Sequence, residues 1–284
     1  MSDQKPNPFY QIIKGLGYFL IFLGANTFIT AVFVTIYTME KLTADQAAGV
    51  FSSTEALTEY STQKVYENSN LILPLYGGLF VMIVVLQFLI RKKPVLKELW
   101  IQKFSPGHLP SLLLLSVGLA IFANNILALL PESLLENYLE KSSFISMGSL
   151  AGSLISQCIF APCVEEIAFR GLMLSRFNKA LPRWVGALIS SFFFGLVHGD
   201  IVWFFYAFLI GSLLCLIANE TDSILSTILV HALYNTIGTL LAYLPISVPL
   251  PIFVVITLAG FALIVIGLLL LFRKKKACKG DAKA

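Results

Sequence analysis

Long apolar stretches separated by short polar segments dominate the pattern of the chain. A membrane-spanning helix needs about 20 mainly apolar residues, because each helical residue rises about 1.5 Å through a hydrocarbon core of about 30 Å. Eight stretches are candidate spans, and the two beside Gly199 and Asp200 are short. In chain order they are residues 15–37, 71–90, 112–130, 146 to beyond 162, 184–197, 201–217, 224–243 and 252–272. The pattern therefore predicts an all-α polytopic membrane bundle of about eight transmembrane helices.

Composition supports lipid as the main solvent of the chain. Hydrophobic residues make up 57% of the sequence and charged residues only 13%. A water-soluble chain of this size would lack enough polar residues to cover its surface. The net charge is only +4, and basic and aromatic residues do not interleave as they do where bases stack. We therefore expect membrane lipids as partners and no nucleic acid.

The basic residues predict the orientation of the spans. They collect before the first span and after the second, fourth and eighth, as in residues 91–93 and 273–276. Basic loops stay on the cytoplasmic side. The sequence therefore predicts an integral membrane protein with both termini in the cytoplasm. The loop with Glu220 and Asp222 has no basic residue and does not add to this argument.

Three segments organise the chain. Residues 1–144 hold the first three spans and an external loop at 38–70. Residues 145–243 form a core that carries the candidate chemistry. Residues 244–284 hold the last span and a basic cytoplasmic tail. We find no internal repeat.

Ionisable residues inside the spans are few, and they cluster in the second half of the chain. Each costs about 2.5 to 3.5 kcal/mol on insertion scales, so each needs a partner or a function. The cluster consists of Glu165, Glu166, Arg170, His198 and His231. We therefore expect the functional site there.

Helical spacing predicts how these side chains divide. Glu166 and Arg170 are four residues apart and share a helix face, as do His231 and Asn235. Glu165 lies about 100° around the helix from Glu166, so the two carboxylates point in different directions. We expect Glu166 to pair with Arg170 as a structural clamp while Glu165 faces the two histidines.

Such a group of side chains can activate water. Glu165 is a candidate general base, and His198 is a candidate to orient the same water or to ligate a divalent metal. His231 and Asn235 can donate hydrogen bonds to the oxyanion that forms when water attacks an amide. Glu165, His198 and His231 are also an acceptable zinc set, so residue types alone do not separate the metal and metal-free mechanisms. The chain has no HExxH motif.

Each feature also has a structural interpretation. Glu166 and Arg170 can simply be an ion pair, and His231 with Asn235 can hold helices together. His198 can sit in a polar turn at the membrane edge, and Phe194 is interpreted as a packing residue. A non-enzymatic scaffold that regulates a partner such as a sensor kinase, or a transporter with a proton relay, would use the same residue types.

Three motifs in order favour the enzymatic interpretation. Residues 165–170 fit EExxxR, residues 194–198 fit FxxxH, and residues 231–235 fit HxxxN. Together they resemble the CPBP family (CAAX protease and bacteriocin-processing, also called Abi) of intramembrane proteases. The resemblance covers about residues 161–235.

The resemblance implies a role for each motif residue. Glu165 and His198 would activate water, and His231 and Asn235 would stabilise the oxyanion. Glu166, Arg170 and Phe194 would support them.

The expected function is therefore that of an intramembrane endopeptidase in a bacterial cell membrane. Its substrate would be a membrane-associated protein or peptide, and one zinc ion is a candidate cofactor. A scaffold or bacteriocin-immunity protein without catalysis is the alternative.

Overall fold

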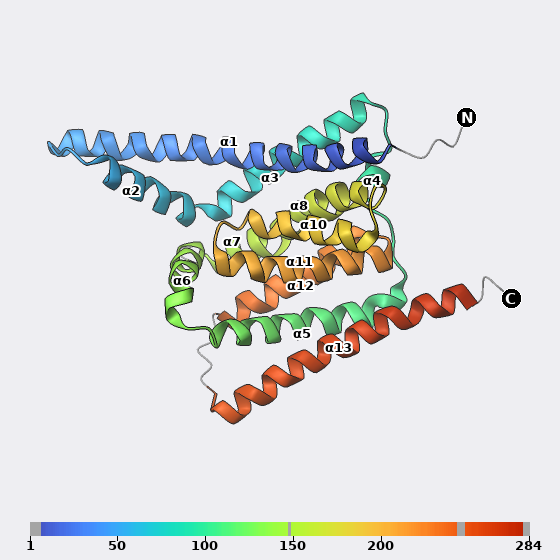
Figure 1. The fold of residues 1–284 in the computed structure, drawn as a ribbon. Helices are drawn as coiled ribbons and strands as arrows, with labels where there is room; N and C mark the ends of the chain where they lie inside the picture. The colour runs from blue at the N-terminus through green and yellow to red at the C-terminus, as the bar shows by residue number, and fades with distance from the viewer. Residues whose placement is uncertain (1–6, 147–148, 243–247, 281–284) are drawn as a thin grey trace.

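The computed structural model describes residues 7–146, 149–242 and 248–280, and these residues form helices without any strand (Figure 1). This architecture confirms the predicted all-α bundle. The α-helices are α1 Pro8–Ala48, α2 Thr54–Glu67, α3 Ser69–Ile90, α4 Val95–Glu98, α5 Leu109–Ala128, α6 Glu132–Ser146, α7 Leu150–Ile155, α8 Ala161–Glu166, α9 Ser175–Phe177, α10 Arg183–Leu196, α11 Ile201–Thr221, α12 Ile224–Ala242 and α13 Leu250–Gly280. A 3-10 turn, η1 (Pro106–His108), precedes α5, and two π-helical segments, η2 (Ser156–Phe160) and η3 (Ile167–Leu174), flank α8.

Seven helical segments of the described chain are long and apolar enough to cross a membrane. The fifth predicted span corresponds to α10, which has 14 residues and a length of about 21 Å. It ends at a turn where Gly199 has φ +66°. Asp200 then caps α11 by accepting from the backbone N–H groups of Val202 and Trp203. The fifth predicted span is thus shorter than a full crossing and forms a helical hairpin with α11.

The first helix is longer than its apolar stretch predicts. α1 runs for 41 residues, from an Asn7 cap to Gly49, which has the left-handed φ of +66°. α2 then folds back along α1, and the Tyr60 hydroxyl donates to Glu40 at 3.2 Å. Most of the predicted external loop at 38–70 is therefore helical.

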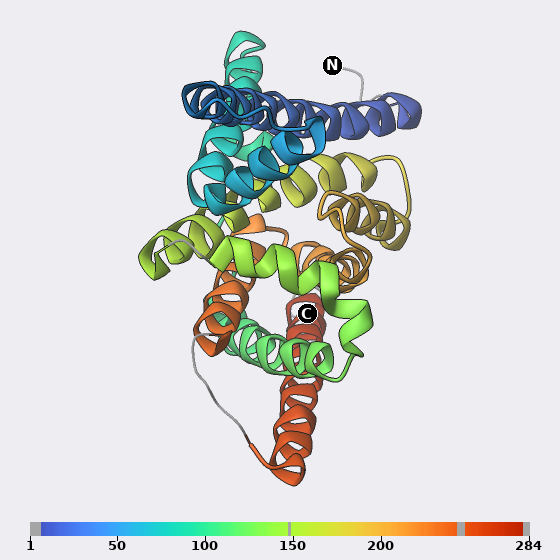
Figure 2. The same ribbon diagram turned by 90° about the vertical axis from the view of Figure 1, so that its left-hand side faces the viewer.

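Two apolar clusters hold the helices together. One joins α1 and α3 to η3, where the Phe22 ring meets Phe80 and Phe169 at centroid distances of 5.4 Å each. The other joins α5, α11, α12 and α13. α5 and α13 approach closely, because a Cβ on Gly118 would lie 2.8 Å from the Gly260 carbonyl oxygen. The view along the helices shows α6 lying across one end of the bundle (Figure 2).

The other end of the bundle collects the basic loops. The start of α1 and the end of α13 lie at this same end (Figure 1). The turn between α11 and α12 also lies there, since the Ser223 hydroxyl donates to the Gln102 carbonyl and the Ile224 N–H to that of Trp100. We call it the basic end; it includes the exposed Arg91 and Lys103.

Candidate active site

The helix that carries the two glutamates is widened on both sides of them. Pro162 has no N–H to donate to the preceding turn, and the chain forms the π segment η2 just before it. The Gln157 carbonyl, five residues before the proline, accepts a hydrogen bond from Asn235 Nδ2 at 2.9 Å. π segments inside helices are frequent at functional sites. This bond ties the fourth span to α12 beside Glu165.

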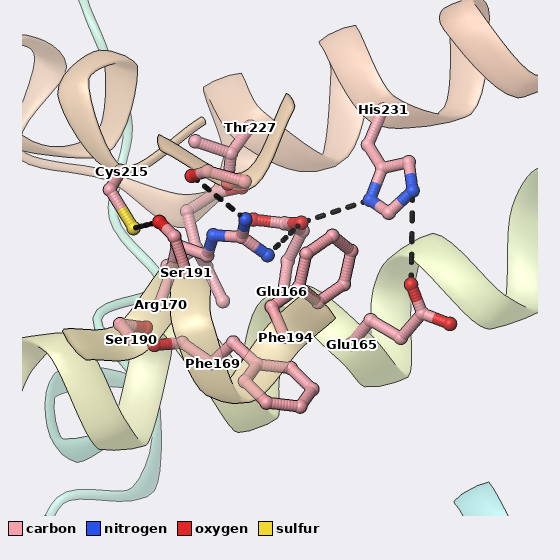
Figure 3. Close-up of polar contacts among 12 residues, drawn as sticks. Glu165, Glu166, Phe169, Arg170, Ser190, Ser191, Phe194, Cys215, Thr227 and His231 are labelled. Atoms are coloured by element: carbon pink, nitrogen blue, oxygen red, sulfur yellow. Dashed lines mark hydrogen bonds and ion pairs between the residues drawn. The ribbon is translucent and has the colours of Figure 1, made fainter. Parts of the chain in front are cut away.

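Glu166 and Arg170 form the predicted clamp in the interior of the protein. Arg170 Nη1 donates to Glu166 Oε1 at 2.9 Å, and Nη2 donates to the Gly211 carbonyl at 3.0 Å (Figure 3). Neither side chain has any exposed surface. The guanidinium also lies 4.4 Å from the centre of the Phe194 ring. The arginine thus links η3 to α10 and α11.

His231 lies between the two glutamates. Its Nδ1 is 2.9 Å from Glu166 Oε1, and its Nε2 is 3.8 Å from Glu165 Oε2 (Figure 3). The predicted division of the glutamates is therefore wrong in one respect, because Glu166 also binds a histidine. The division was argued from one helix alone, whereas His231 comes from α12 and reaches both carboxylates. Since the Arg170-paired carboxylate is an acceptor, His231 Nδ1 carries the proton in this bond.

His198 is held at the end of α10 by the helix itself. Its Nδ1 lies 2.7 Å from the Phe194 carbonyl oxygen, which can only accept, so Nδ1 carries the proton. Nε2 of the neutral ring then keeps its lone pair. The Phe194 ring packs against both histidines, at centroid distances of 5.0 Å to His198 and 5.9 Å to His231. Phe194 is only 2% exposed and occupies the packing position expected of it.

One cavity brings the four predicted catalytic residues together. Glu165, His198, His231 and Asn235 all line it, and its volume is about 310 Å³. They come from three separate parts of the chain, namely α8, the end of α10 and α12. The remaining polar and aromatic side chains of the lining are Asn124, Tyr138, Ser153, Gln157, Phe194, Trp203, Tyr206, Tyr234 and Thr239.

The family model of Rce1-like type II CAAX prenyl endopeptidases matches residues 147–237. This segment is similar to an Rce1-like domain. It contains every residue of the three motifs, so the match confirms the resemblance to the CAAX protease family. No curated protein and no solved structure matches the chain.

The predicted zinc ligands lie on three different parts of the chain. Among the described residues, no group of three His, Cys, Asp or Glu side chains gathers closely enough to hold a metal ion. His231 Nδ1 is already bound to Glu166, and His198 Nδ1 faces a backbone carbonyl. Each ring thereby keeps its Nε2 for a further ligand, as metal-binding histidines do, but Glu165, His198 and His231 do not gather as a three-ligand set among the described residues.

Several cavity residues of the Rce1-like domain were not singled out from the sequence. Gln157 is a polar residue in an apolar stretch, and this pattern could have identified it as a candidate site residue. Tyr206 and Tyr234 carried no such signal, because tyrosine is also enriched at membrane–water interfaces without a catalytic role. Asn124 also lines the cavity, whereas its neighbour Asn125 binds across helices to Thr257 Oγ1 at 2.8 Å.

Proposed function

We propose that the chain is an intramembrane endopeptidase that hydrolyses a peptide bond with a water molecule activated between Glu165 and His198. The observation that carries the proposal is the single cavity lined by Glu165, His198, His231 and Asn235. The family match independently supports an endopeptidase of the CAAX type. A scaffold function does not require an acid and two imidazoles around one cavity.

The proposed reaction begins with water between Glu165 and His198. Glu165 takes one proton from the water while the His198 Nε2 lone pair accepts a hydrogen bond from the other. The oxygen attacks the peptide carbonyl carbon and forms a tetrahedral oxyanion. When this intermediate collapses, the C–N bond breaks and the protonated Glu165 returns its proton to the leaving amine.

His231 and Asn235 are proposed to stabilise the oxyanion. The Asn235 amide nitrogen has two hydrogens, and Gln157 accepts one of them, which leaves the second for the oxyanion. His231 can donate through Nε2 only when its ring carries both protons. The Glu166 carboxylate accepts from Nδ1 and fixes the orientation of the ring. Glu166 thus acts as a positioning residue for His231.

The cavity is proposed to open away from the basic end. Asn124 and Thr239 lie near the ends of α5 and α12, and both helices begin at the basic end. Trp203 lies near the start of α11, and Tyr138 lies on α6, which crosses the far end. If basic loops face the cytoplasm, the substrate enters from the non-cytoplasmic half of the membrane.

The size and lining of the cavity limit the substrate. A volume of about 310 Å³ is at the lower end of the range of about 300 to 1,000 Å³ for ligand sites. It suits a short extended stretch of chain whose apolar side chains contact tyrosine, tryptophan and phenylalanine rings. We therefore propose that the substrate presents an unwound segment of a membrane-anchored protein or peptide, with prenylated peptides as one candidate class.

Substitution of Glu165 tests the function. Purified protein in lipid vesicles is incubated with prenylated and unprenylated membrane-anchored peptides, and products are identified by mass spectrometry. We expect Glu165→Gln to lower cleavage by roughly 10²- to 10⁴-fold, the usual contribution of a general base. Glu59→Gln, the same change at an exposed position of α2, is the matched control and should cleave at the wild-type rate.

The same pair of variants separates enzyme from scaffold. A regulatory scaffold should keep its cellular phenotype in the Glu165→Gln variant, because the substitution preserves shape. Cleavage by Glu165→Gln at the wild-type rate would contradict the proposed mechanism.

A further inference from the structure

A second cavity lies at the basic end of the bundle, far from the catalytic residues along the helices. It has a volume of about 450 Å³ and lies between the start of α1, the end of α3, α4 and the segment around α9. Five cationic side chains and one carboxylate, that of Glu98, line it. The cationic residues are Lys14, Arg91, Lys93, Arg176 and Lys179.

Close packing of α1 holds the walls of this cavity in place. A Cβ on Gly15 would lie 2.7 Å from the Phe177 ring, so only glycine allows this approach without a shift of the ring. Lys14 and Arg176 are the chain neighbours of these two residues. The contact therefore keeps the two cations on facing walls.

Arg176 is the least accessible of the cations. It is 3% exposed, and its Nη2 donates to the Glu98 carboxylate. Its Nε is also buried and has no hydrogen-bond partner among the described residues. Basic residues that only set the orientation of the spans need to lie near the membrane surface. They do not need to be buried, as the Arg176 guanidinium is.

The charges around the cavity are strongly unbalanced. Glu98 compensates one of the five cations, which leaves four in excess. Partial burial and the nearby Arg176 charge lower the pKa of Lys179 from its ordinary value, as expected where like charges are crowded. A bound anion would relieve this repulsion.

We propose that this cavity binds the phosphate group of an anionic phospholipid. Guanidinium and ammonium groups are the usual partners of phosphate, and basic pockets between membrane helices bind anionic headgroups. The same ends of α1 and α3 expose large apolar side chains that can contact the acyl chains. These side chains are Phe9, Ile13, Leu89 and Ile90.

Lipid retention by the purified protein tests the proposal. Native mass spectrometry measures binding of phosphatidylglycerol and phosphatidylcholine to detergent-solubilised full-length protein. The test variant, Arg91→Gln with Lys93→Gln, removes two exposed cavity cations. The matched control, Lys97→Gln with Lys103→Gln, removes two exposed lysines of the same end that do not line the cavity.

We expect the wild type to retain one phosphatidylglycerol per chain and to release phosphatidylcholine. The test variant should bind phosphatidylglycerol roughly 30-fold more weakly. Each basic residue near the membrane surface strengthens binding of an anionic lipid by about fivefold, and the variant lacks two of them. The control should bind as the wild type does. Equal weakening in both variants, or equal binding of both lipids, would overturn the proposal.

A parallel measurement with excess inorganic phosphate identifies the source of the phosphate group. If inorganic phosphate leaves lipid retention unchanged, the ligand is the lipid headgroup. If it displaces the lipid from the wild type, the cavity is still a phosphate site but takes a soluble phosphate compound, and the phospholipid assignment is overturned.

Discussion

Removal of the Arg170 guanidinium should destabilise the protein strongly, and removal of its partner at the same time should reverse much of the loss. Arg170→Met keeps an unbranched apolar side chain in the buried site but leaves the Glu166 carboxylate without its cation. The double variant Glu166→Gln with Arg170→Met has no buried charge at this pair. Its amide oxygen still accepts from His231 Nδ1.

The magnitudes decide which loss dominates in each variant. The hydrogen bond to Gly211 is worth about 0.6 kcal/mol by the average of measured pairs in membrane proteins. The contact of the guanidinium with the Phe194 ring adds about 2 kcal/mol when desolvated. A buried charge left without its partner costs about 3 to 5 kcal/mol. The single variant bears all three losses, whereas the double variant bears only the first two.

Unfolding in mixed micelles with increasing dodecyl sulfate, followed by circular dichroism, gives the free energy of unfolding of each variant. We expect the single variant to lose about 6 to 8 kcal/mol and the double variant about 2 to 3 kcal/mol, by the values above. A double variant as unstable as the single one would refute the argument, because the uncompensated carboxylate would then not be the main cost.

Two further predictions concern access and metal. In a background without native cysteines, Tyr138→Cys should react with a membrane-impermeant maleimide in intact cells and Lys103→Cys only in lysed cells; the reverse pattern would contradict entry from the non-cytoplasmic side. Protein treated with a chelator should still cleave peptide, because Glu165, His198 and His231 do not gather as a three-ligand set among the described residues; loss of cleavage that zinc restores would contradict this.

The spans could be predicted because lipid imposes a length of about 20 apolar residues on each crossing. The end of α1 could not be predicted as well. Residues 38–48 leave the apolar stretch but contain good helix formers such as Met, Glu, Lys and Ala, so α1 continues to Gly49. Hydropathy does not contain this signal. By contrast, α10 (Arg183–Leu196) agrees with the predicted span 184–197, because its apolar stretch ends at the turn around Gly199.

The site was predictable in composition but not in all its contacts. The i, i+4 spacing correctly predicts the ion pair of Glu166 and Arg170, because both residues lie on one short stretch of helix. His231 binds Glu166, which lies 65 residues before it in the chain. Sequence spacing cannot predict which of the two adjacent carboxylates such a distant residue contacts. The contact also depends on the packing of α12 against α8. Periodicity within one helix cannot supply that contact.

The adjacent glutamates differ most in their access to the cavity. The side chain of Glu165 is 18% exposed, whereas that of Glu166 has no exposed surface. A carboxylate without access to the cavity cannot take a proton from a water held there, however basic it is. Glu166 already binds the Arg170 guanidinium and the His231 ring, so a change of its charge acts on stability and on the orientation of His231. Glu165 borders the cavity, and its charge is the one that a bound water would meet first.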